Sequence, residues 1–74
     1  MNKNAIIDFV LGRMESMKFF SSRASKRAML DQAFGALMFY IHYHVEDEQE
    51  LVEWWEGGIR QQFEKAIYEE AIYE

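Results

Sequence analysis

The chain has 74 residues, of which 50% are hydrophobic and 16% aromatic, and its formal net charge is -5 at pH 7. This length allows a single domain over residues 1–74, and the apolar content excludes a disordered chain. The absence of cysteine excludes disulfides and thiolate zinc sites, so a reducing, cytoplasmic compartment is expected. No secretory signal or membrane-length apolar run of about 20 residues is present, so we expect no membrane contact.

The two ends of the chain differ in charge. Residues 1–45 carry six basic and three acidic side chains, whereas residues 46–74 carry two basic and ten acidic ones. Such an asymmetry suits antiparallel packing of the chain's own segments, or the pairing of two copies.

Residues 4–20 are predicted to form the first helix, which Asn2 or Asn4 could cap. Its apolar side chains follow helical spacing; they are Ile6, Ile7, Val10, Leu11, Met14 and Met17.

Residues 22–44 predict a second helix that is apolar around much of its circumference. One stripe consists of Leu30, Phe34, Leu37, Met38, Ile41 and Val45. A neighbouring stripe consists of Met29, Ala33, Ala36, Tyr40 and Tyr43. Together they indicate a central helix or one that touches a second chain. Residues 40–45 also alternate like a short strand, but the periodicity leading into them favours a helix.

The third segment begins with Asp47 and Glu50, which have the spacing of a capping box. Leu51, Trp55 and later apolar residues then recur every four positions, and "AIYE" at 66–69 and 71–74 predicts two turns of a tail helix. Gly57 and Gly58 interrupt this helix at a cost of about 1 kcal/mol each relative to alanine. Either a bend or the close approach of another group at Gly58 would offset that cost, and the bend is favoured.

We therefore predict an all-α fold, a small antiparallel three-helix bundle with a central second helix and a third helix that is bent or closely packed at Gly57–Gly58. The expected core consists of Ile6, Val10, Met14, Met17, Leu30, Phe34, Leu37, Ile41, Leu51, Trp55, Ile59 and Phe63.

The sequence offers no chemistry for catalysis, a cofactor or a metal. No serine stands in a nucleophile motif, and no phosphate-binding glycine loop is present. His42 and His44 point about 160° apart on a helix and cannot share an ion. We expect His44 to lie on the apolar face and His42 to pair with Glu46, and we expect no enzyme activity.

Two sets of residues are candidates for binding. Trp54, Tyr40 and Tyr43 are candidate partner contacts, because aromatic side chains at the edge of an apolar stripe resemble the anchors of protein interfaces. For Trp54, a half-buried position at the rim of the core is the simpler interpretation. Arg23, Lys26 and Arg27 are candidate phosphate contacts, although a solvated face or pairing with the acidic third segment is the simpler interpretation.

These features favour a non-catalytic protein-interaction module that self-associates as a homodimer. One alternative is a nucleic-acid-linked regulator that uses Arg23–Arg27. Another is an acidic inhibitor that occupies a basic groove on its target. A chain this small and plain is also compatible with an origin in a phage or another mobile element, which no residue demonstrates.

Overall fold

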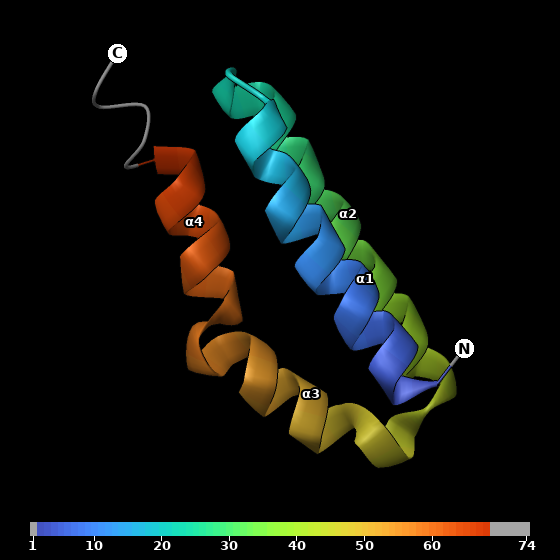
Figure 1. The fold of residues 1–74 in the computed structure, drawn as a ribbon. Helices are drawn as coiled ribbons and strands as arrows, with labels where there is room; N and C mark the ends of the chain where they lie inside the picture. The colour runs from blue at the N-terminus through green and yellow to red at the C-terminus, as the bar shows by residue number, and fades with distance from the viewer. Residues whose placement is uncertain (1, 69–74) are drawn as a thin grey trace.

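The computed structural model describes residues 2–68, which form helices joined by short turns (Figure 1). No strand occurs in this range, so the predicted all-α fold is confirmed and residues 40–43 are helical. The elements are α1 (Lys3–Ser16), a 3₁₀ turn (Met17–Phe19), α2 (Arg23–Tyr43), a second 3₁₀ turn (Val45–Asp47), α3 (Glu48–Trp54), a π turn (Trp55–Ile59) and α4 (Arg60–Tyr68). The second half of the predicted tail helix lies outside the described residues.

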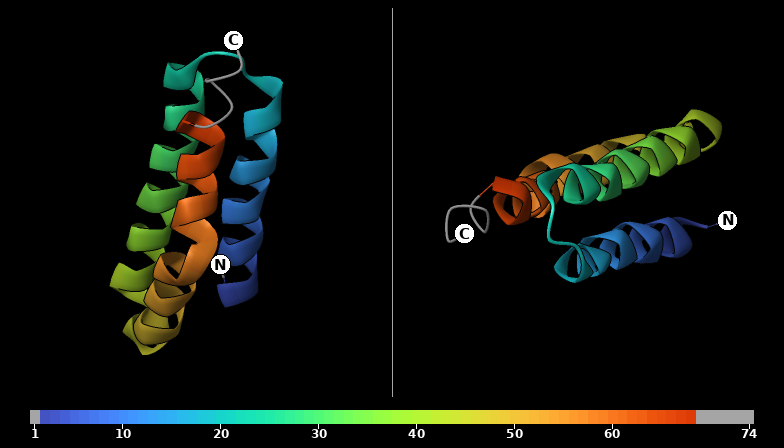
Figure 2. Two further views of the ribbon diagram at one scale, coloured as in Figure 1. Left: turned by 90° about the vertical axis from the view of Figure 1, so that its left-hand side faces the viewer. Right: turned by 90° about the horizontal axis from the view of Figure 1, so that it is seen from above.

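The helices form a bundle with α2 at its centre. Helices α1 and α2 run antiparallel and side by side, and the chain then turns back so that α3 and α4 pass along the α1–α2 pair (Figures 1 and 2). Helix α2 packs against α1, α3 and α4, as predicted for the central helix. Within residues 2–68, none of the helices combines the length and apolarity that crossing a membrane requires.

Side-chain caps start the first two helices. The Asn2 carboxamide oxygen accepts a hydrogen bond from the backbone N–H of Ala5 at 2.8 Å, and the Ser22 hydroxyl accepts one from Ser25 at 3.1 Å. The predicted capping box at α3 is wrong, because Asp47 precedes that helix without a side-chain cap. Its carboxylate instead accepts a hydrogen bond from the hydroxyl of Tyr40.

The glycine pair bends the third helix, which confirms the favoured interpretation. Gly58 leaves the helical conformation, with φ 161° and ψ -25°, inside the π turn that joins α3 to α4. A Cβ atom built at Gly57 or Gly58 would meet nothing within 4 Å, so no other segment among residues 2–68 approaches either glycine closely. The bend leaves Gln62 exposed and keeps Trp55 and Phe63 buried.

Gly57 offers a direct test of this bend. Its backbone stays helical and its Cβ position is open, so Gly57→Ala is expected to raise the free energy of unfolding by roughly 0.5–1 kcal/mol. Gly58→Ala gains nothing from helix propensity, because residue 58 is not helical. Thermal melts of the two variants would separate them, and an equal rise in melting temperature for both would indicate a straight helix.

Most of the predicted core residues are buried, but the buried face of α2 differs from the predicted one. The buried apolar residues are Ile6, Val10, Met17, Met29, Ala33, Leu37, Tyr40, Ile41, Leu51, Trp55, Phe63 and Ile67. Met14, Leu30 and Ile59 are half-buried, and Phe34 is wrong as a core residue because it is 45% exposed. Helix α1 lies on one side of α2 and α3–α4 on another, so the buried face runs between the two predicted stripes.

Candidate interaction surface on helix α2

A hollow opens at the C-terminal end of α2, where this helix faces the start of α1. It has a volume of about 350 Å³, and its walls are mostly carbon. The residues that line it are Ile6, Ala36, Phe39, Tyr40, Tyr43 and His44. A hollow of this size with aromatic walls can hold an apolar or aromatic group.

Two exposed rings stand at this hollow. Phe39 is 67% exposed and Tyr43 is 65% exposed. Their ring centroids lie 5.0 Å apart at an angle of 58°, a tilted arrangement that aromatic pairs favour. Each ring therefore limits the freedom of the other, which lowers the entropy that a binding partner would have to remove.

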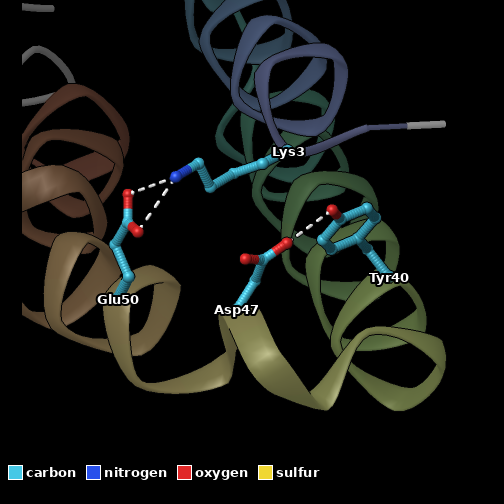
Figure 3. A network of polar contacts seen from close by, with 4 residues as sticks. All are labelled: Lys3, Tyr40, Asp47 and Glu50. Carbon is cyan, nitrogen blue, oxygen red and sulfur yellow. Dashed lines mark hydrogen bonds and ion pairs between the residues drawn. The ribbon is translucent and has the colours of Figure 1, made fainter.

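Tyr40 and His44 form a more rigid wall. Their rings stack with centroids 4.2 Å apart. The Tyr40 hydroxyl donates a hydrogen bond to the Asp47 carboxylate at 2.8 Å (Figure 3). Tyr40 is only 5% exposed, so it supports the hollow more than it offers surface to a partner. Burial, together with the hydrogen bond to Asp47, raises the pKa of Tyr40 to about 12.

A second polar contact fixes the same end of the bundle. The Lys3 ammonium lies 2.9 Å from the Glu50 carboxylate and so ties α1 to α3 (Figure 3). The hydrogen bond with this carboxylate raises the pKa of Lys3. Glu50, predicted as the second member of a capping box with Asp47, therefore joins two helices instead.

The raised pKa of Tyr40 makes stability depend on alkaline pH. An unfolded tyrosine ionises near pH 10, so between about pH 10 and 12 the unfolded chain loses a proton that the folded chain keeps. This contribution to stability is complete below pH 10 and is lost as the pH rises toward 12. We expect Tyr40→Phe to lower the melting temperature at pH 7 and to flatten its fall above pH 10. Parallel melts of both proteins cancel the titration of other groups, and identical alkaline slopes would contradict the assignment.

A guanidinium lies further along the same side of the α1–α2 pair. Arg13 sits over the ring of Phe9 at 5.2 Å and donates to the Gln32 side chain of α2 at 3.4 Å. Its Nε is buried and has no hydrogen-bond partner among residues 2–68. The side chain is thus positioned, but its capacity for hydrogen bonds is only partly used.

The hollow and the Arg13 guanidinium lie along one face of the α1–α2 pair. Residues 32, 36, 39 and 43 recur every three or four positions, so their side chains line one side of the helix. We call this the outer face, defined as Gln32, Ala36, Phe39 and Tyr43 of α2 with Ile6, Phe9 and Arg13 of α1. It has the aromatic hollow at one end and the guanidinium at the other.

Among the candidate partner contacts, the structure brings Tyr40 and Tyr43 together and places Trp54 elsewhere. Trp54 is half-buried on α3, packs against the core and does not line the hollow. Tyr43 is the exposed member of the set, and Phe39 was missed although it stands four residues before Tyr43 on the same helix. Arg13 was also missed, and its spacing of four from Phe9 was the available signal.

The basic stretch at the start of α2 contacts α4. Arg27 donates to the Tyr68 hydroxyl at 2.6 Å, and the Arg23 guanidinium lies over the Tyr68 ring at 5.5 Å. Lys26 is 6% exposed, and its ammonium lies 3.5 Å from the backbone oxygen of Ala66. A phosphate would therefore compete with Tyr68 for both arginines, and Lys26 lies away from solvent.

His44 lies against the apolar face as predicted, stacked on the Tyr40 ring, whereas the predicted pairing of His42 with Glu46 is wrong. The Glu46 carboxylate lies 3.5 Å from Nδ1 of His44, not beside His42, and His42 makes an edge contact with the Tyr43 ring. In the part of the chain that the structure describes, no three His, Asp or Glu side chains gather as metal ligands would.

Comparison with known proteins gives no relative. No family model matches the chain, and no similar curated protein or solved structure was found.

Proposed function

We propose that the protein is a non-catalytic interaction module that forms a homodimer through the outer face of α2. The observation that carries this proposal is the pair of exposed rings, Phe39 and Tyr43, beside an aromatic hollow. Rings that can bury their surface only against another molecule are typical of protein interfaces.

A second copy is the partner that the outer face fits best. An interface between identical chains related by a two-fold axis must be complementary to itself. The outer face carries both the exposed rings and the hollow, so the rings of each copy can pack against the hollow of the other. A cytoplasmic location, favoured by the absence of cysteine, is part of the same proposal.

The exposed area predicts a weak dimer. Aromatic side chains bury about 150–250 Å² each, so the exposed parts of Phe39 and Tyr43 offer together roughly 200–300 Å² per copy. Even with the flanking α1 residues, this falls short of the roughly 800 Å² per partner of a standard interface. We expect a dissociation constant on the order of 10–500 μM.

Sedimentation equilibrium from micromolar to millimolar concentration tests the proposal. The average mass should rise from the 8.9 kDa of one chain toward twice that value. A mass that stays at one chain up to about 1 mM, above the dissociation constants expected for weak interfaces of this size, would remove the proposed homodimer.

A further inference from the structure

The two ends of the outer face differ in a way that fixes how two copies would meet. The Tyr43 end carries aromatic rings and His44, which line the hollow. The Glu46 carboxylate lies 3.5 Å from Nδ1 of His44. The Gln32 end carries the Arg13 guanidinium. At 1.5 Å per residue these ends lie about 16 Å apart along α2.

We infer that the α2 helices of two copies pack antiparallel about a two-fold axis near residues 36–39, so that Tyr43 of each copy covers Arg13 of the other. This pairing rests on the proposed homodimer and specifies its geometry. An antiparallel arrangement centred there places residue 43 opposite residue 32 of the second copy, and residue 39 opposite residue 36.

Arg13 is suited to this contact. One face of its guanidinium already lies on the Phe9 ring, at 5.2 Å. Its hydrogen bond to the Gln32 side chain is long, at 3.4 Å. A tyrosine from the second copy could lie on the opposite face, which would place the cation between two aromatic rings. The same arrangement brings Glu46 of the second copy toward the guanidinium, so the charges are complementary as well.

The centre of the outer face has room for the other ring. Ala36 lines the hollow, and a Cβ atom added at Gly35 would meet nothing within 4 Å. These two small residues stand where the antiparallel pairing places Phe39 of the second copy. The small side chains at both positions leave the α2 backbone open to the ring of the second copy.

The parallel alternative is disfavoured by charge. With the two α2 helices parallel, Arg13 would meet Arg13 and Glu46 would meet Glu46. Like charges placed opposite each other oppose association, whereas the antiparallel pairing places each arginine beside the other copy's carboxylate.

A double-mutant cycle of Arg13→Ala and Tyr43→Ala, measured as the dissociation constant of the dimer, tests this pairing. The two-fold axis repeats the contact, so each substitution removes it twice, and we expect the dissociation constant to rise roughly five- to thirtyfold in either variant. The dissociation constant of the double variant should be little higher than that of either single variant, because both changes remove the same contact. The dissociation constant of Arg13→Lys should lie between those of Arg13→Ala and the unchanged protein.

Gly35→Glu provides a variant that does not depend on Arg13. The side chain has space in the monomer and glutamate is a better helix former than glycine, so the fold should persist while the new charge blocks Phe39 of the second copy. Gly57→Glu adds the same charge in another exposed position away from the outer face and should leave the dimer unchanged.

These measurements distinguish failure of the antiparallel pairing from failure of the homodimer. A dimer whose dissociation constant is unaffected by Arg13→Ala and by Gly35→Glu would overturn this pairing and leave the homodimer standing. A chain that stays monomeric at about 1 mM would remove the homodimer and the pairing together.

Discussion

Trp55→Ala is expected to lower the free energy of unfolding by about 3–5 kcal/mol. Trp55 is almost completely buried, and its ring lies 5.7 Å from both Phe34 and Phe63, so alanine would leave a cavity where α2 meets α3 and α4. A domain of this size has a total stability of roughly 4–11 kcal/mol. Urea unfolding followed by circular dichroism should show a midpoint at a much lower urea concentration, and a largely unfolded variant if the stability lies at the lower end of this range.

Trp55→Phe is the matched control. The indole N–H of Trp55 is buried and has no hydrogen-bond partner among the described residues. Phenylalanine keeps a ring in the core and removes this unsatisfied group, whose burial costs about 1–3 kcal/mol. The two effects oppose each other, so we expect a net loss under about 1.5 kcal/mol. A similar loss in both variants would show that the ring does not fill the core as described.

Phe39→Ser combined with Tyr43→Ser should abolish the dimer and leave the fold intact. Both rings are about two-thirds exposed, so their removal should change the stability of the monomer by less than about 1 kcal/mol in total. Their loss from each copy removes most of the apolar surface of the outer face. We expect the dissociation constant to rise at least roughly hundredfold, beyond the range of sedimentation equilibrium.

Phe19→Ser is the control for that variant. Phe19 is 79% exposed in the turn after α1, and it lies outside the outer face. If general surface hydrophobicity drove association, Phe19→Ser would weaken the dimer as much as the outer-face changes do. The proposed pairing requires that it leaves the dissociation constant unchanged.

The sequence was enough to predict the helices because their signals are local. Helical periodicity, the Asn2 cap and the glycine pair each depend on residues a few positions apart, and all three appear in the structure. The buried face of α2 was harder to predict, because this helix is apolar around much of its surface. Only the placement of α1, α3 and α4 decides that Ala33 and Met29 are buried while Phe34 is partly exposed.

The polar contacts could not be predicted for a similar reason. Asp47 and Glu50 have the spacing of a cap, but Tyr40 and Lys3 lie close in space and use their carboxylates instead. The candidate site was predicted in part. Tyr43 follows from its place at the edge of an apolar stripe, whereas Arg13 joins the outer face only because α1 and α2 pack side by side.

Nuclear Overhauser contacts between copies test the antiparallel homodimer most directly. In a millimolar mixture of isotope-labelled and unlabelled chains, filtered spectra report only contacts that cross from one copy to the other. We predict contacts from the Tyr43 ring to the Arg13 side chain and from the Phe39 ring to the Ala36 methyl group. Intermolecular contacts confined to α3 and α4, or none at all at that concentration, would contradict the pairing of the outer faces.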